Sequence, residues 1–552
     1  MFVPTVSTGS APNAIESPSS GLPSNGSLRE TAAPRSQQEA VTKSNKALLR
    51  YVVSQAVPNA MSQLALVTVG FTTVLFVSQL HDSEILGGVG VGSMLYNILG
   101  LSLGCGLSAG LDTLVSQSNG AQLYDRSGVH LQRAVVVCSL VCIPAFVILF
   151  FTEDMLVAIG QSPGVAARAG QYVRGTCLSL WPMYLSSCLS TFLRAQTLPQ
   201  ASVYATWTSN VFHIGSCYYF ICYLDMGAFG AGLAFSATQL LSFSILLGYV
   251  HFVRPGVTEK SWVPWDCARA TSNLQGFLEK ALPCAMLMWA EWWCAEVMTL
   301  LAGYLGVAAL AAHTAVIQVF VLIYMTAGGI SCAGAALVGN ALGALDARLA
   351  KRSAVVVWLV MLAACSVIDA VLYFQTDALC RLFTQDEEVH EQLASLFHIM
   401  LVVVPLDCLQ TVIDGILRGL GKQGLAFKVK LCCMWGIRVP LAVYLGFYTP
   451  LGVAGIWWGS AGGLAVTMAI YVLLVFRVDW QAEVDACGDY QRLGTPRRSQ
   501  KHGVGDGLQR HFTPVPGLCR TATGLVVHDD DDEEDDEEFL LRDGTDAHGG
   551  HR

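Results

Sequence analysis

The chain has 552 residues, of which 53% are hydrophobic and only 13% are charged. A soluble globular protein carries about 25% charged residues, so this composition excludes a set of soluble domains and indicates a surface that largely faces lipid. Ten consecutive acids at 529–538 account for the net charge of −9. The rest of the chain is nearly neutral and lacks the basic footprint of a nucleic-acid-binding protein.

Apolar segments form a long body between two polar tails. Residues 1–46 are rich in Ser, Pro, Gly and Asn and have no signal-peptide-like apolar stretch, which predicts a disordered cytosolic tail. A transmembrane helix needs about 20 mostly apolar residues, and twelve segments meet this requirement. They lie at 53–79, 85–110, 131–151, 171–191, 200–223, 228–252, 277–303, 307–332, 354–374, 393–416, 426–447 and 452–476.

The last six segments repeat features of the first six. The matching pairs, spaced by 223 to 225 residues, are Pro58 and Pro283, Gly120 and Gly343, Leu193 and Leu417, and Gly227 and Gly452. Similar offsets in the same order indicate a duplication. We therefore predict an all-α polytopic membrane protein with twelve transmembrane helices in two six-helix repeat bundles.

Domain boundaries follow from these segments. We predict an N-lobe at 47–253, a cytosolic linker at 254–276, a C-lobe at 277–480 and a disordered acidic cytosolic tail at 481–552. Two repeats with a binding site between them are typical of secondary transporters. The sequence contains no Walker A phosphate loop, which argues against an ATP-driven pump.

Loop charges predict the orientation. One set of loops is basic and the other mainly acidic, so by the positive-inside rule the basic loops and both termini are cytosolic. The basic set comprises Arg126, Arg133, Arg194, Arg254, Lys260, Arg269, Arg348, Lys351, Arg352, Arg418, Lys422, Lys428 and Lys430.

The seventh segment carries two acids. Glu291 lies about 21 Å along the helix from Phe277, near the middle of the bilayer, and Glu296 lies nearer the outer face. Ionisable residues inside a membrane are functional by default. We expect Glu291 to bind a proton or cation, with a structural hydrogen bond as the alternative, and both roles stay open for Glu296.

The tenth segment carries a polar stripe of Asp407, Gln410, Asp414 and Arg418 on one helix face. Asp407 lies about 15 Å from the cytosolic end and is the second candidate for a coupling acid. Asp414 precedes Arg418 by four residues, and an ion pair between them explains it without a role in transport.

Other polar and aromatic positions give weaker signals. Gln63 lies in the first segment, and Trp292 belongs to a set of aromatic residues that could line a cation-binding cavity. We expect His213 and His313 to be helix-packing residues. The 18 cysteines show no zinc-site spacing, so neither a metal nor another cofactor is expected.

Several segments resemble multidrug and toxin extrusion (MATE) transporters. The stretches 110–117, 120–121 and 129–133 are similar to the loop after the second helix of that family, and 291–296, 338–344 and 415–419 resemble its eukaryotic branch. The resemblance runs from about residue 47 to 480. It implies two six-helix bundles, export of organic molecules and, for eukaryotic members, proton antiport.

The same resemblance implies roles for individual residues. Glu291, Glu296 and Asp407 match the cation-coupling acids of the C-terminal lobe, and Gln63 matches a polar position in the first helix of animal members. Gln318 departs from the pattern, because some animal members have Glu there.

We therefore expect a monomeric proton-coupled exporter of organic, cationic and chemically varied small molecules, embedded in the lipid bilayer of the plasma membrane or of a vacuolar or endolysosomal membrane. It would not be an enzyme and would not bind nucleic acid. Two alternatives remain: a lipid-linked sugar flippase of the same superfamily, which would favour a basic cavity, and a membrane-embedded acyltransferase-like enzyme, which would need His paired with Asp or Asn.

Both tails should lie in the cytosol. An epitope inserted at residue 20 or residue 510 should bind antibody only after cells are permeabilised, because the basic loops fix the orientation. Labelling of either epitope on intact cells would contradict the predicted topology.

Overall fold

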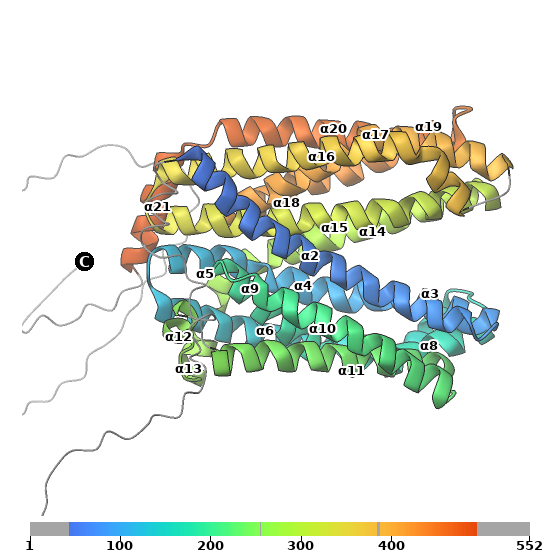
Figure 1. The fold of residues 1–552 in the computed structure, drawn as a ribbon, viewed down its shortest axis with the longest axis horizontal. Coiled ribbons are helices and arrows are strands. Elements are labelled where there is room, and N and C mark those ends of the chain that lie inside the picture. The colour runs from blue at the N-terminus through green and yellow to red at the C-terminus, as the bar shows by residue number, and fades with distance from the viewer. Residues whose placement is uncertain (1–43, 254–255, 384–386, 494–552) are drawn as a thin grey trace, which may run out of the picture. The chain divides into compact units, whose positions relative to one another are not determined.

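The computed structural model describes residues 44–253, 256–383 and 387–493, and their regular structure is entirely helical (Figure 1). The first half comprises α2 (Asn45–Ser78), α3 (Ser83–Tyr96), η1 (Asn97–Leu101), α4 (Ser102–Ser108), α5 (Gly110–Gly120), α6 (Tyr124–Phe150), α7 (Thr152–Ala158), α8 (Pro163–Cys177), α9 (Leu180–Ala195), α10 (Gln200–Cys217), η2 (Tyr218–Tyr223), α11 (Gly227–Gly248) and η3 (Tyr249–Val253). The linker and second half comprise α12 (Val257–Ser261), α13 (Cys267–Thr271), α14 (Leu274–Tyr304), α15 (Val307–Gly343), α16 (Ala347–Phe383), α17 (Glu387–Gly419), α18 (Gln423–Cys433), η4 (Met434–Arg438), α19 (Val439–Phe447), α20 (Gly452–Phe476) and α21 (Trp480–Leu493).

Each of the twelve predicted transmembrane segments corresponds to a helix or to consecutive helices, so the predicted fold class is confirmed. Nine helices of the described chain are long and apolar enough to cross a membrane. The other three segments are α8–α9, α10 with η2, and α14. The first is interrupted between two short helices, the second is rich in polar side chains, and the third carries several charges.

The two large apolar cores, one for each half, each include the beginning of the other half's first helix. The core of the second half includes Leu48 and Val52 of α2, and the core of the first half includes Phe277 and Ala281 of α14. Figure 1 shows α2 crossing obliquely from the α16 side of the bundle toward α3. Because α2 and α14 hold equivalent places in the two repeats, the exchange is reciprocal and ties the halves together.

Small residues bring the halves together where the loops are basic, and we call this end of the bundle the basic end. A Cβ atom on Gly120 would lie 2.0 Å from the backbone oxygen of Asn340, and one on Gly343 would lie 2.0 Å from that of Gln117. Lipid tails are as apolar as the side chains, so close packing of small residues, and not the hydrophobic effect, holds membrane helices together. Both contacts therefore require glycine.

Hydrogen bonds cross between the halves at the same end. Asn119 Nδ2 donates to Asn340 Oδ1 at 2.7 Å, and Gln117 Nε2 donates to the backbone oxygen of Gly419 at 3.0 Å. Asn340 Nδ2 in turn donates to the backbone oxygen of Ala195 at 2.8 Å. The two halves are thus closed against each other at the basic end.

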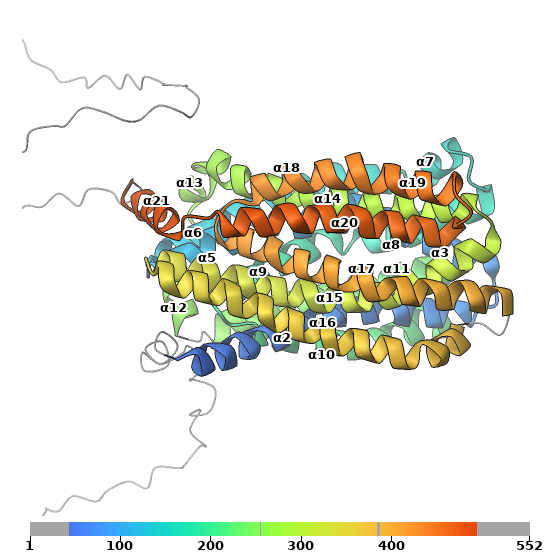
Figure 2. The same cartoon turned by 90° about the horizontal axis from the view of Figure 1, so that it is seen from above.

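Residues 481–493, predicted as part of a disordered tail, belong instead to α21, which begins at Trp480. The apolar residues Trp480, Val484 and Cys487 recur at helical spacing, and Val484 and Cys487 are buried. This amphipathic pattern explains why the segment folds against the bundle. Figures 1 and 2 both place α21 at the basic end.

Helix α21 has partners in both halves. Glu483 forms an ion pair with Lys422 of the second half at 2.6 Å. Arg126 of the first half donates to the backbone oxygen of Gln491 at 3.1 Å. Asn45 and Lys46, predicted as the end of the N-terminal tail, begin α2. The remaining parts of the predicted tails, 1–43 and 494–552, lie outside the described residues, and their disorder stays a prediction.

The glycine contacts give a test of closure at the basic end. Gly120→Ala places a methyl group against the Asn340 backbone, and overpacking of this kind costs about 1–3 kcal/mol. We expect faster hydrogen–deuterium exchange at the ends of α5 and α15. Gly90→Ala is the control, because a Cβ atom there meets nothing within 4 Å. Equal exchange in both variants would show that the contact does not hold the end closed.

Candidate functional site

Glu291 lies at a meeting point of three helices. Its carboxylate, on α14, forms an ion pair with the Lys430 ammonium group from α18. Tyr324 of α15 donates a hydrogen bond from its hydroxyl group to Glu291 Oε2 at 3.0 Å. The Glu291 side chain is 15% exposed, so the carboxylate is partnered but still accessible.

Lys430 also contacts a second acid. Its Nζ atom lies 2.6 Å from Asp414 Oδ2 on α17, and the Tyr471 hydroxyl group of α20 donates to Asp414 Oδ1 at 2.7 Å. We call Glu291, Lys430, Asp414, Tyr324 and Tyr471 the lysine cluster. It joins five helices of the second half and holds two carboxylates against one ammonium group.

Two expectations about these charges were wrong. Lys430 is no loop residue: it lies on α18 and is only 1% exposed. Asp414 does not pair with Arg418, since the Arg418 guanidinium group turns to Asp112 in the other half, at 3.0 Å. Helical spacing alone could not show which way the two side chains point.

The position of Lys430 was detectable in the sequence. The buried residues of α18 are Gln423, Ala426, Lys430 and Cys433, which lie on one helix face. A lysine in such a stripe has to be paired inside the protein, because an isolated charge is costly in an apolar environment.

Asp407 is buried but lies outside the lysine cluster. It precedes Asp414 by two helical turns, about 10.5 Å along α17. Within the described residues its carboxylate makes no hydrogen bond or ion pair, and its charged neighbours include Arg438 and Asp414. Between the two acids, Gln410 is fully buried, with neither amide atom hydrogen-bonded to the described part of the chain. This stretch of α17 therefore carries unused polar groups.

The remaining predicted site residues are not joined to the lysine cluster. Gln63, half-buried on α2, has its Nε2 atom 3.6 Å from the position of a Cβ atom on Gly328, so it faces α15. Glu296 and Trp292 are half-buried on α14. None of the three forms a hydrogen bond or ion pair with the cluster in the described chain.

Both intramembrane histidines have neutral partners. His213 is hydrogen-bonded to Thr73 at 2.9 Å and to Thr238 at 2.8 Å. His313 is hydrogen-bonded to Thr299 at 3.2 Å and accepts from Trp457 at 3.1 Å. Among the described residues, neither is paired with Asp or Asn, as an acyltransferase-like site would require, so their contacts agree with a packing role.

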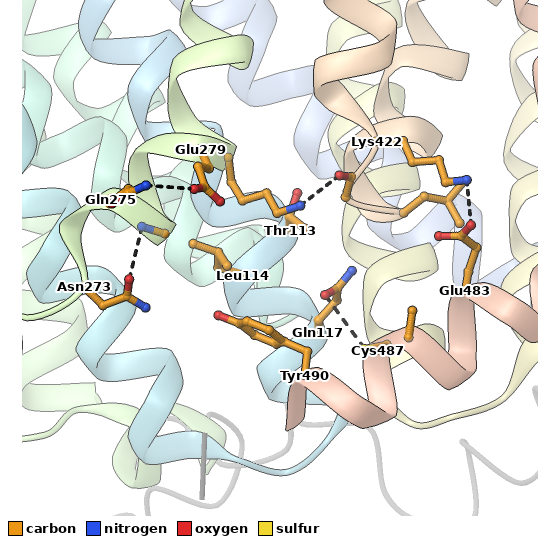
Figure 3. A pocket seen from close by; sticks show the side chains of 15 residues that line it. Thr113, Leu114, Gln117, Asn273, Gln275, Glu279, Lys422, Glu483, Cys487 and Tyr490 are labelled. Atoms are coloured by element: carbon orange, nitrogen blue, oxygen red, sulfur yellow. Dashed lines mark hydrogen bonds and ion pairs between the residues drawn. The ribbon is translucent and has the colours of Figure 1, made fainter. Parts of the chain in front are cut away.

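A cavity of about 570 Å³ lies at the basic end, away from every predicted site residue. Its walls come from α5, the start of α14, the turn between α17 and α18, and α21. Figure 3 shows the ion pair between Lys422 and Glu483 on one wall and Gln117 beside Cys487. The cavity lies where the two halves and α21 meet.

Comparison with known proteins agrees with the internal repeat. The MatE family model matches residues 58–219 and again residues 283–444, which together are more than half of the chain. The two matches begin 225 residues apart, the spacing seen in the sequence.

Named relatives and solved structures are similar along most of the chain. Multidrug and toxin extrusion protein 1 of Danio rerio is 28% identical over 77% of this chain and 71% of its own length. The protein of that name from Homo sapiens is 27% identical over 86% and 83%. The crystal structure of the eukaryotic MATE transporter AtDTX14 has a TM-score of 0.75 at 23% identity, covering 80% of this chain and 98% of that one.

The Arg418–Asp112 pair between the halves gives a second test. Asp112→Asn leaves the largely buried guanidinium group of Arg418 without its counter-charge, and breaking a buried pair costs roughly 3–5 kcal/mol. We expect a clear loss of thermal stability in detergent micelles. Asp125→Asn, at an exposed position on α6, should change stability by at most about 0.5 kcal/mol. A pair that contributes nothing would leave the two variants equally stable.

Proposed function

Since this chain belongs to the MATE family of efflux transporters, we propose that it exports organic cations in exchange for protons, by alternating access between its two halves. The chain is a multi-pass membrane transporter and not an enzyme. Its substrates are small molecules and its surroundings are the lipid bilayer. The exchanged ion, the positive charge of the substrates and action as a monomer are parts of the proposal.

The observation that carries the proposal is the environment of Glu291. Its carboxylate is partly accessible and is held by a phenol and an ammonium group on two other helices. Such a carboxylate can accept either a proton or an organic cation, but protonation removes the charge that a cation needs. Exchange requires this difference, because a ligand shifts an equilibrium only through its differential affinity for the two states.

Asp407 is the second acid that supports the proposal. It is buried, has no hydrogen-bond partner in the described residues, and lies two turns from the lysine cluster on α17. A cation or a proton would supply the missing partner. Nothing observed favours a lipid-linked sugar flippase, since the buried ammonium group of this region is matched by two acids.

Closure at the basic end fits an alternating mechanism. Transporters of this type rock two lobes around a central site so that one end opens as the other closes. The glycine contacts and hydrogen bonds between the halves are at the basic end, whereas Glu291 lies further along α14. We propose that the contacts at the basic end break when substrate enters from the cytosol.

Proton coupling can be tested with purified protein in liposomes that have an acidic lumen, with tetraethylammonium as the probe. Glu291→Gln should reduce pH-driven uptake to the level of empty liposomes, because the amide cannot carry a removable proton. Asp407→Asn should do nearly the same. Asp414→Asn should also impair uptake strongly, since Asp414 holds Lys430.

Glu391→Gln, at an exposed position near the start of α17, is the matched control and should keep full uptake. A normal response of Glu291→Gln to the pH gradient would refute coupling through this acid. Strong uptake driven by a sodium gradient in place of the pH gradient would instead indicate a sodium-coupled transporter.

A further inference from the structure

Lys430 has two carboxylate partners on two different helices. Its ammonium group pairs with Glu291 of α14 and with Asp414 of α17, and the lysine itself is buried on α18. An uncompensated ammonium group is costly in such a place. Lys430 can therefore leave one acid only if the other remains as its partner.

The two acids are not equivalent. Glu291 is 15% exposed and Asp414 is 7% exposed. Tyr471 donates a hydrogen bond to Asp414 and occupies one of its oxygens. Glu291 is therefore the more exposed partner of Lys430, and Asp414 is the more sheltered one.

The charged and titratable groups around Lys430 also distinguish the two acids. Tyr324 faces Glu291 from α15, Tyr471 faces Asp414 from α20, and Arg438 adds a second positive charge from η4. Arg438 also lies near Asp407, whose negative charge offsets it. With both acids ionised, the five residues of the lysine cluster themselves have one negative charge in excess. One further proton or monovalent cation neutralises it.

We infer that Lys430 is an internal cation, which occupies Glu291 when neither a proton nor an organic cation is bound there and withdraws to Asp414 when either arrives. The inference rests on the proposed function and identifies the group with which proton and substrate compete. Lys430 keeps its three protons and its charge throughout. The incoming proton binds a Glu291 oxygen, and the ammonium group changes only its partner.

This exchange has a direct consequence for specificity. A substrate must displace a tethered ammonium group, so it has to offer Glu291 a better partner than Lys430 does. Organic cations with apolar surface can do so by packing contacts in addition to charge. Lys430 is thus a specificity-determining residue, and Asp414 is a positioning residue that acts through it.

Binding of radiolabelled tetraethylammonium to purified protein at pH 8, counted per folded molecule after size-exclusion chromatography, tests the inference. Lys430→Met should tighten the Kd by about tenfold, because the internal competitor is gone. Asp414→Asn should weaken the Kd by about tenfold, because Lys430 then has Glu291 as its remaining carboxylate partner. The double variant Lys430→Met/Asp414→Asn should return to within about threefold of Lys430→Met.

Lys428→Met is the matched control, at an exposed position two residues earlier on α18, and should leave the Kd unchanged. A merely structural lysine would change the yield of folded protein but not the Kd of the folded fraction. If Lys430→Met does not fold, the double variant is compared with Asp414→Asn. Tighter binding by the double variant supports the exchange, and equal binding overturns it.

The outcomes also separate this inference from the proposed function. If wild-type protein binds tetraethylammonium and Lys430→Met has the same Kd as Lys428→Met, the internal cation is wrong while the exporter of organic cations stands. If wild-type protein neither binds nor transports the probe, the proposed function fails and the inference fails with it.

Discussion

The structure depends on one constraint: a charge inside a bilayer has no water to solvate it, so the protein must supply its partner. Lys430 meets this constraint with two carboxylates, and two tyrosine hydroxyl groups complete the arrangement. The result is a polar centre that fixes α14, α15, α17, α18 and α20 relative to one another. The same constraint makes the lysine cluster sensitive to ligands, because a ligand that binds one acid leaves the other as the only carboxylate partner of Lys430 in the cluster.

A second consequence of the lipid environment is the way the halves meet. Apolar side chains gain little by leaving lipid for one another, so the halves are joined by close backbone contacts and hydrogen bonds. Gly120 and Gly343 supply the contacts from equivalent places in the two repeats, and Asn340 supplies hydrogen bonds to the opposite half. Contacts of this kind are numerous but individually weak, which suits an interface that has to open and close.

The sequence was enough to predict the helices and the candidate acids, but not the contacts between helices. The twelve segments and the duplication were predictable, because membrane thickness fixes helix length and the repeat preserves its spacing. Glu291 and Asp407 could be singled out because acids are rare in such segments. The partner of Glu291 could not, since Lys430 reaches it from another helix, and the same holds for Arg418, which pairs with Asp112 of the other half. Helix α21 was missed because its apolar stripe of Trp480, Val484 and Cys487 is short and lies in a polar stretch.

Helix α17 connects the lysine cluster to the contacts between the two halves. Asp414 belongs to the lysine cluster, and Arg418, one turn later, holds Asp112 of the other half. A change of partner by Lys430 alters the charge balance at Asp414, and the next turn of the same helix carries the ion pair between the halves. Because α17 is a continuous helix across this region, a shift that accommodates one of these contacts displaces the other. The polar stripe that marked this helix in the sequence thus joins the proposed cation site to the contact that holds the halves together.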